Sequence, residues 1–343
     1  MEKSKLLTDI LQSVSRSFYL TLRILPVNIR EPISVAYLLA RVADTIADTD
    51  AIAAEKRLHY LRLFQKQVME MPNEKALQEI VDNLSEQQTN KDEQYLLKSI
   101  HQVCMLLYGL WPDDQARVKA VVATLIQGME IDLTYFPSEK EGAVKAFKTE
   151  FELDNYIYHV AGCVGGFWTE VVMAHEPALH DWNKKHNINL GINFGKALQL
   201  TNILRDLPSD LRIGRCYLPD YELILQGLKP DMLLKSENSC KARPLLIAWL
   251  QTTINYYADA QQYFTEVPRH CFRLRLSVLW PILIGLATLA EISKSERWLD
   301  PESPGKVARH WVYGMLLCSI PLSFSNRLVV WWMNWLRGKI VMV

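Results

Sequence analysis

Apolar residues along the chain recur at intervals of three and four residues, which is the spacing of one face of an α-helix. A clear example is the series Leu58, Leu61, Phe64 and Val68. Runs in which apolar and polar residues alternate between turn residues, a pattern typical of strands, are hard to find. The pattern therefore predicts a protein built almost entirely of α-helices.

Prolines and polar clusters divide this pattern into about ten predicted helices. The breaks fall at Pro26, Pro72, Pro112, Pro137, Pro177, Pro219, Pro230, Pro268, Pro301 and Pro304. The polar segment 73–93 is expected to be a solvated connection or an exposed pair of helices, and no chemistry is assigned to it. Because no repeat, low-complexity tract or long linker interrupts the chain, residues 1–310 are predicted to form a single all-α domain.

The segment 311–343 differs from the rest by its tryptophans and cations. Its apolar run from Trp311 to Phe324 is shorter than the roughly 20 residues that a transmembrane helix needs, and Asn326 and Arg327 interrupt it. Tryptophans beside cationic side chains suit a helix that lies among lipid headgroups. The segment is therefore predicted to associate with the cytoplasmic side of a membrane. The alternatives are a buried terminal helix, an oligomer contact or a short tilted span.

The charge balance and the cysteines narrow the choice of partners. Lys plus Arg equals Asp plus Glu, at 38 each, so no nucleic-acid partner is expected and any anion must be bound by a local cluster. The six cysteines lack the spacing of metal ligands, and the charged start does not resemble an export signal. A reducing cytoplasm is predicted, with the cysteines as core residues.

The first informative motif is a pair of aspartates in an apolar helix expected to follow Pro32. At about 100° per residue, one helix stripe would carry an aromatic ring, a guanidinium and two carboxylates. These side chains belong to Tyr37, Arg41, Asp44 and Asp48. Two aspartates four residues apart repel each other, so a divalent cation would compensate them.

A second stripe of the same kind occurs later in the chain, with an arginine beside it at Arg205. Its members are Gln199, Asn202, Asp206 and Asp210. One such aspartate pair alone would most often be solvated surface. Two pairs, each in apolar surroundings with an arginine nearby, predict one shared site. There Mg²⁺ or Mn²⁺ would bind the four aspartates and a diphosphate, and arginines would neutralise the remaining charge.

Around these residues the sequence resembles the squalene and phytoene synthase family, from Ser15 to about Arg309. The resemblance rests on a series of ordered motifs: Ser15-Arg-Ser-Phe18, Asp44-Thr-Ile-Ala-Asp48, Gly128-Met-Glu-Ile-Asp-Leu133, Tyr156-Ile-Tyr-His-Val-Ala-Gly162, Gln199-Leu-Thr-Asn-Ile-Leu-Arg-Asp206 and Gly214-Arg-Cys-Tyr-Leu-Pro219. It implies the all-α isoprenoid synthase fold around a central cavity. It also implies the head-to-head joining of two prenyl diphosphates through a cyclopropyl diphosphate.

The resemblance also implies roles for particular residues. Tyr156 is expected to assist proton transfer. The other expected catalytic residues are the four aspartates that would bind metal: Asp44, Asp48, Asp206 and Asp210. The residues expected to bind substrate are Ser15, Arg16, Ser17, Phe18, Tyr37, Arg41, Gln199, Asn202, Arg205, Arg215 and Tyr217. Those expected to bind a cofactor are Arg16, Arg41, Asn202, Arg205 and Arg309.

A dry cavity lined by aromatic rings would protect a carbocation. Phe18, Tyr37, Tyr156 and Phe167 are candidates for that lining, although Phe167 is equally consistent with an ordinary core residue. Gly162, Gly165 and Gly166 predict a helix kink, with close passage of a substrate tail as the alternative.

Several segments bear on the branch of the family. Asp44-Thr45, the segment 281–290 and Arg309 resemble squalene synthases. They predict the reductive reaction, in which two farnesyl diphosphates give squalene through presqualene diphosphate and a hydride from NADPH. The segment 214–219 resembles the phytoene branch instead.

Other departures from the pattern are Ala47 and Ser209, which stand where many relatives carry an acidic residue, and Pro208, which is expected to bend or fray its helix. The alternative prediction is a dehydrosqualene or phytoene synthase without NADPH. A class I terpene cyclase and a catalytically inactive helical partner are more distant alternatives.

Overall fold

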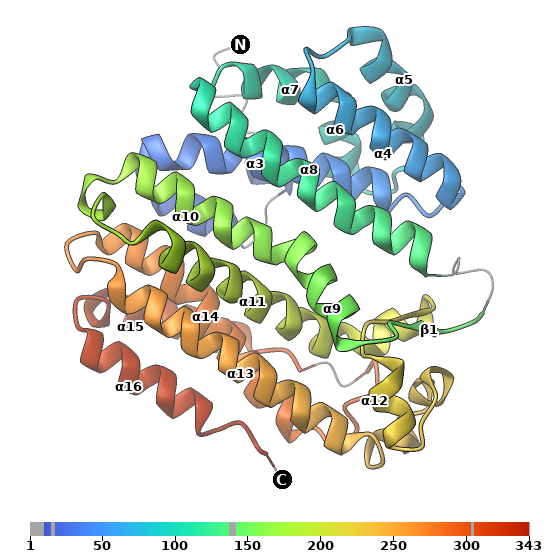
Figure 1. The fold of residues 1–343 in the computed structure, drawn as a ribbon, viewed down its shortest axis with the longest axis vertical. Coiled ribbons are helices and arrows are strands. Elements are labelled where there is room, and N and C mark those ends of the chain that lie inside the picture. Colours follow the sequence, from blue (N-terminus) through green and yellow to red (C-terminus); the bar gives the residue numbers. More distant parts are fainter. Residues whose placement is uncertain (1–9, 15–17, 137–141, 303–304, 343) are drawn as a thin grey trace. The chain divides into compact units, whose positions relative to one another are not determined.

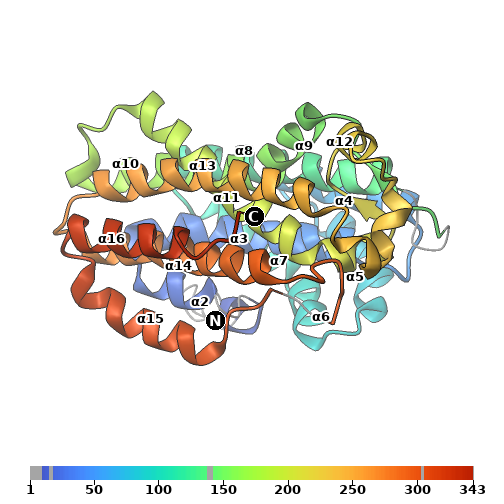
Figure 2. The same cartoon turned by 90° about the horizontal axis from the view of Figure 1, so that it is seen from below.

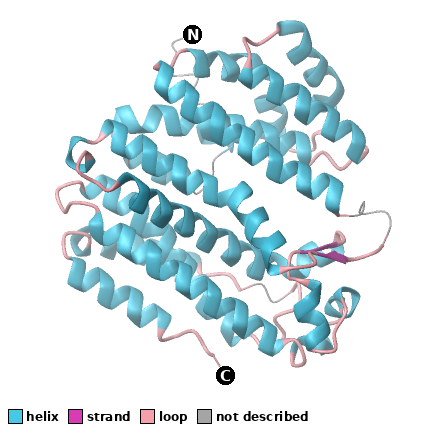
Figure 3. Ribbon diagram, viewed as in Figure 1, coloured by secondary structure: helices cyan, strands magenta, loops and turns pink. Residues whose placement is uncertain are grey.

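The computed structural model describes residues 10–14, 18–136, 142–302 and 305–342, with residues 18–20 described by their backbone alone. Within these ranges the chain is almost entirely helical (Figures 1 and 3), which confirms the predicted all-α class. The strands of this described part are two short segments that pair in parallel, β1 (Lys145–Ala146) and β2 (Arg215–Cys216).

The chain forms two compact units, here called unit 1 (Met1–Tyr135 with Phe167–His180) and unit 2 (Phe136–Gly166 with Asp181–Val343). The helices of unit 1 are α2 (Phe18–Ile24), α3 (Val27–Ala47), α4 (Ala54–Met69), α5 (Glu74–Leu84), α6 (Lys91–Lys98), α7 (Ile100–Tyr108), α8 (Pro112–Tyr135) and most of α10 (Cys163–His175). The helices of unit 2 are α9 (Glu150–Ile157), α11 (Lys184–Arg212), α12 (Asp220–Leu225), α13 (Arg243–Glu266), α14 (Phe272–Lys294), α15 (Arg309–Leu322) and α16 (Asn326–Arg337).

The helix α3 is the central element of unit 1 and packs against α4, α7 and α8. It begins at Val27 and includes Pro32, so the expectation that the helix starts after that proline is wrong. A proline inside a helix removes one backbone hydrogen bond. The buried side chains of Ile29 and Ile33 on either side of it keep this stretch helical through their packing.

In unit 2, α11 packs along α13, and α14 packs against both. The helix α14 is the one helix among the described residues that is long and apolar enough to cross a membrane. However, 83% of its apolar stretch is buried inside the protein, so its composition is that of a core helix.

The helices α15 and α16 form a hairpin that packs on α14 (Figure 2). A buried arginine joins the two parts: Arg275 on α14 donates to the carbonyl of Ser323 at 2.6 Å and to the side chain of Asn326 at 2.6 Å. Burial lowers the pKa of this guanidinium to about 10. One face of the predicted membrane-associating segment is therefore docked on unit 2.

The sequence predicted that all six cysteines are core residues, and this prediction is wrong for two of them. Four of them are buried: Cys104, Cys163, Cys216 and Cys271. Cys240 and Cys318 are exposed, because they lie at the end of a short 3-10 segment and on the hairpin.

Candidate active site

The first aspartate motif lies at the carboxyl end of α3. The neighbouring residues Val42 and Ala43 are fully buried, whereas 43% of the Asp44 side chain is accessible to solvent. Asp48 is exposed and ends the helix, and its backbone N–H donates to the carbonyl of Asp44 at 2.8 Å. The stripe predicted from the sequence therefore forms on a helix whose other face is in the core.

The electrostatic environment of Asp44 is unusual. Burial of the carboxyl, together with the charges of Asp48, Glu93 and Asp132, raises its pKa to about 7 against the opposing effect of Arg41. The side chain remains reachable by water, so the carboxyl is surrounded by protein without being sealed off. Negative charge therefore exceeds positive charge around Asp44.

Glu93 is a member of this cluster that the sequence did not reveal. It lies on α6, in the segment 73–93 to which no chemistry was assigned, and that segment forms helices, as the second of its two predictions stated. Arg41 donates to the Glu93 carboxylate at 2.5 Å, whereas its distance to Asp44 is 3.8 Å. The guanidinium of the first motif is therefore held mainly by a residue from another helix.

The second motif lies on α11, which continues without interruption through Pro208 to Arg212. The expected fraying at Pro208 does not occur, because Leu204, Leu207 and Pro208 itself are buried along the packed face of the helix. On the opposite side, the predicted stripe forms as expected, with side chains that are exposed or half-buried: Gln199, Asn202, Asp206 and Asp210.

Arg205 and Asp206 form a two-pronged ion pair. The Arg205 Nε donates to one carboxylate oxygen at 2.8 Å, and Nη2 donates to the other at 2.5 Å. The hydrogen bond to Asp206 raises the pKa of Arg205. Both oxygens of Asp206 are thus engaged by the arginine that the sequence assigned to diphosphate.

A cluster of aromatic rings surrounds the predicted catalytic tyrosine in unit 2. Tyr156 stacks on Tyr217, and both rings are almost fully buried. Phe147 lies beside both rings, and Phe136 contacts Tyr217 edge-on. Two predicted site residues are therefore in contact, whereas the two phenylalanines were not predicted because no motif marks them.

The chain after α9 forms one π-helical turn, Tyr158–Gly162, in the segment where a kink was predicted, and such turns are a common cause of kinks. A second observation explains why glycines occur in this segment and in the helix that it approaches. A β-carbon on Gly165 would lie 1.8 Å from the carbonyl oxygen of Gly191, and one on Gly195 would lie 2.3 Å from that of Ala161. Glycine is therefore required where this segment approaches α11.

The remaining predicted residues are distributed as follows. Ser15, Arg16 and Ser17 lie outside the described residues, and Phe18 is the first residue of α2. The Tyr37 hydroxyl donates to the carbonyl of Val14 at 3.2 Å. Three further predicted residues lie outside the two aspartate motifs: Arg215 on β2, Phe167 buried on α10, and Arg309 exposed at the start of α15.

The two motifs belong to different units, and their convergence on one diphosphate stays a prediction. Within the described residues, no group of three or more His, Cys, Asp or Glu side chains could hold a metal ion by itself. Magnesium usually takes one or two carboxylates and completes its shell with water and substrate phosphate. The crowded negative charge around Asp44 fits that mode of binding.

The arginines expected to bind a cofactor have different surroundings. Arg41 is paired with Glu93 and Arg205 is paired with Asp206. Arg309, the third predicted cofactor-binding arginine that the structure describes, is exposed at the first residue of α15. The binding of NADPH by these residues stays a prediction.

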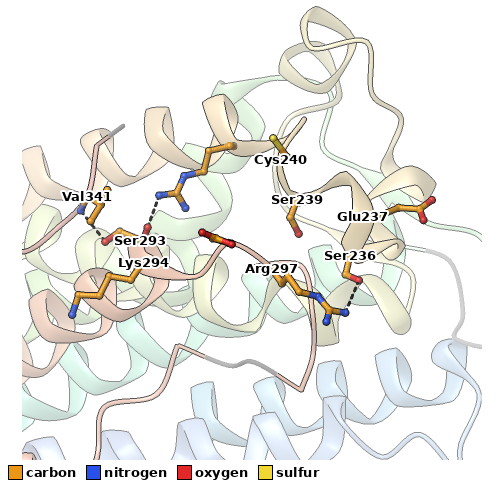
Figure 4. Close-up of a pocket in the computed structure, with 10 residues that line it drawn as sticks. Ser236, Glu237, Ser239, Cys240, Ser293, Lys294, Arg297 and Val341 are labelled. Carbon is orange, nitrogen blue, oxygen red and sulfur yellow. Dashed lines mark hydrogen bonds between the residues drawn. The ribbon is translucent and has the colours of Figure 1, made fainter.

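A pocket of about 990 Å³ in unit 2 contains none of the predicted site residues. It is lined by side chains from η6 (Ser236–Ser239), the start of α13 and the end of α14 (Figure 4). Its arginines are already engaged: Arg243 donates to the carbonyls of Ser293 and Ser295, and Arg297 pairs with Asp300 at 2.9 Å. We assign it no function.

The described residues form a helical protein with two pairs of aspartates on long helices, each pair beside an arginine. A family model described as squalene/phytoene synthase matches residues 11–310. The chain belongs to the squalene/phytoene synthase family, whose members are head-to-head prenyltransferases that act on prenyl diphosphates.

Curated relatives include phytoene synthases from fungi and plants. A bifunctional lycopene cyclase/phytoene synthase of Arthroderma gypseum is 32% identical over 262 residues, which are 76% of this chain and 42% of that protein. A chloroplastic phytoene synthase of an Oncidium hybrid cultivar is 32% identical over 168 residues, 49% of this chain and 36% of the relative. The chain thus spans less than half the length of these relatives.

Solved structures confirm the fold that the family resemblance implied. The structure of TcSQS with the ligand BPH1237 matches with a TM-score of 0.79 and 19% identity, over 99% of this chain and 92% of the other. A dehydrosqualene synthase in complex with ligand matches with a TM-score of 0.65 and 20% identity, over 98% and 97%. At this identity the likeness shows the isoprenoid synthase fold alone.

Proposed function

We propose that the chain joins two prenyl diphosphates head to head and ends the reaction by proton loss, as a phytoene- or dehydrosqualene-type synthase. The curated relatives described above are phytoene synthases, so they favour the non-reductive reaction over the predicted squalene synthase. The observation that carries the proposal is the placement of Asp44 and Asp206 on accessible faces of long helices whose opposite faces are buried, within the family match.

The residues of the two motifs would bind and ionise the diphosphates. Asp44, Asp48, Asp206 and Asp210 would hold divalent cations, which supply positive charge to the leaving diphosphate. The nearby arginines would bind diphosphate oxygens in two-pronged geometry. Ionisation of one substrate gives an allylic cation, which the double bond of the second substrate attacks.

The product is determined by how each carbocation loses its positive charge. One proton leaves as the cyclopropane ring closes, the second diphosphate leaves, and a second proton is lost from the rearranged cation. Tyr156, buried among aromatic rings, is the residue that would assist proton transfer. Those rings also exclude water, which would otherwise trap the cation as an alcohol.

Squalene synthase is the second candidate function, and one feature favours it. The pair Asp44-Thr45 resembles the aspartate-threonine of squalene synthases, and the Thr45 hydroxyl donates to the carbonyl of Arg41 at 2.8 Å. The reductive reaction would need NADPH to deliver hydride in place of the second proton loss.

Product analysis separates the two candidates. The protein is incubated with Mg²⁺ and either farnesyl or geranylgeranyl diphosphate, with and without NADPH, and the hydrocarbon is identified by mass spectrometry. A product that is unsaturated at its central bond, at equal yield with and without NADPH, is expected. Squalene formed only with NADPH would establish the second candidate instead, and a product from a single substrate molecule would contradict both.

We also propose that the α15–α16 hairpin attaches the protein to the cytoplasmic side of a membrane. Its outer face carries exposed apolar side chains at helical spacing: Tyr313, Leu317, Ile320, Phe324, Leu328, Trp331 and Trp335. The segment 309–343 contains four Arg and Lys residues and no Asp or Glu. Aromatic rings with cations suit anionic headgroups, where an apolar product would also enter the bilayer.

A further inference from the structure

The arginines of the two aspartate motifs are paired in different ways. In unit 1, Arg41 is held by Glu93 at 2.5 Å and stays 3.8 Å from Asp44. In unit 2, Arg205 binds both oxygens of Asp206, at 2.8 and 2.5 Å. The key aspartate of the first motif is therefore open on its accessible side, whereas that of the second is covered by a guanidinium.

The position that Arg205 occupies is the one a metal ion would need. A carboxylate binds a divalent cation through the same oxygen lone pairs that accept hydrogen bonds from a guanidinium. Since Arg205 donates to both Asp206 oxygens, it covers one edge of the carboxylate, and a cation that chelates this edge needs the arginine to move away. No arginine has to leave Asp44 before a cation binds, because the nearby Arg41 is hydrogen-bonded to Glu93.

The Arg205–Asp206 ion pair can also be separated by another ligand. Adjacent residues on a helix do not face each other, so the long arginine side chain must curl back to reach its neighbour. Both side chains are partly accessible, at 32% and 43%. Ion pairs with such access to water add little stability. Neither partner is fixed by the core, and a stronger ligand for either one can separate them.

We propose that Arg205 is a positioning residue that stands in for a divalent cation on Asp206 and transfers to the diphosphate when that cation binds. This inference rests on the proposed function. The exchange conserves charge pairing: the cation takes the carboxylate, and the guanidinium takes the phosphate oxygens that arrive with the substrate. It follows that the Asp44 motif binds a cation without diphosphate, whereas the Asp206 motif binds one weakly without diphosphate and more tightly with it.

Manganese binding, followed by electron paramagnetic resonance with and without inorganic pyrophosphate, tests this order. Without pyrophosphate, Asp44→Asn is expected to remove the Mn²⁺ bound by the wild-type protein, and Asp206→Asn is expected to leave it unchanged. Arg205→Gln should expose Asp206, so that a second class of Mn²⁺ sites binds on the order of tenfold more tightly than in the wild type. With pyrophosphate, the wild type should gain the second class itself.

The matched control is Arg297→Gln, which removes another arginine of unit 2 that pairs with an aspartate, Asp300, at 2.9 Å. It should leave Mn²⁺ binding unchanged, and the melting temperature and circular dichroism of each variant report its folding. The inference is overturned if Arg205→Gln binds Mn²⁺ like the wild type. It is also overturned if Asp206→Asn loses the Mn²⁺ bound without pyrophosphate. A wild type that binds no Mn²⁺ even with pyrophosphate would overturn the proposed metal-dependent function as well.

Discussion

The rings of Tyr156 and Tyr217 lie stacked, with their centroids 4.9 Å apart and their planes inclined by 16°. The two residues come from α9 and from the turn after β2, so the contact joins segments some 60 residues apart in the chain. Because both rings are buried, at 3% and 6% exposure, their positions are set by packing. The Tyr156 hydroxyl is therefore carried on a rigid aromatic platform.

This arrangement predicts that Tyr156→Phe separates chemistry from stability. The stacked ring is kept, so the melting temperature should change little. Loss of the hydroxyl should lower turnover by about 10²-fold or more if it assists proton transfer. The control is Tyr158→Phe, which alters a partly exposed tyrosine two residues away and should leave turnover unchanged. Equal turnover in wild type and Tyr156→Phe would remove the assigned role.

Substitutions in the aspartate motifs are expected to lower catalytic turnover and to leave the fold intact. Asp44→Asn and Asp206→Asn keep the size of the side chain and remove a charge that would bind the cation. Each is expected to lower turnover of prenyl diphosphates by about 10²–10³-fold, the usual cost of losing a group that stabilises developing charge. Asp50→Asn, an exposed aspartate just beyond the first motif, should retain wild-type turnover.

The sequence predicted which residues share a helix face, because that depends only on the helical period. Both stripes formed on α3 and α11 as expected. It could not predict which carboxylate each arginine would choose. Arg41 pairs with Glu93 because tertiary packing brings α6 beside α3. Pro208 likewise left its helix intact because local propensity was outweighed by packing.

The close approach of α10 and α11 predicts a severe effect of a small substitution. Gly165→Ala would place a methyl group 1.8 Å from the carbonyl oxygen of Gly191, so the two backbones must separate. We expect the free energy of unfolding to fall by about 1–3 kcal/mol or more in urea denaturation. Gly314→Ala is the matched change, since its new methyl group meets open space on α15. That variant should be as stable as the wild type or up to about 1 kcal/mol more stable.

The outer face of the hairpin predicts binding to anionic vesicles. Replacing Trp331 and Trp335 by serine removes two exposed rings from that face. Because burying one large apolar side chain contributes about 1.5–3 kcal/mol, sedimentation with vesicles should weaken by tenfold or more. Trp111→Ser, a change at an exposed tryptophan of unit 1, should leave binding intact. Loss of a dimer in place of vesicle binding would identify the face as an oligomer contact.

The raised pKa of Asp44 predicts how stability depends on pH when divalent ions are removed. Its pKa is about 7 in the folded protein, against an ordinary value of 3.8. The folded state therefore holds a proton that the unfolded chain has already released between these two values. Stability from this group is present below the lower value and is lost as pH rises toward about 7. In EDTA, the melting temperature of the wild type should fall from pH 5 to pH 7 relative to Asp44→Asn.

Divalent cations should reverse this trend, because binding requires the ionised carboxylate and releases the proton. The stabilisation by Mn²⁺ should therefore increase as pH rises through 7 in the wild type, whereas Asp44→Asn should lack most of it. Asp50→Asn serves as the control, since it removes a nearby aspartate that is exposed. If wild type and Asp44→Asn gave parallel melting profiles under both conditions, the crowding of charge around Asp44 would not be the origin of its affinity for cations.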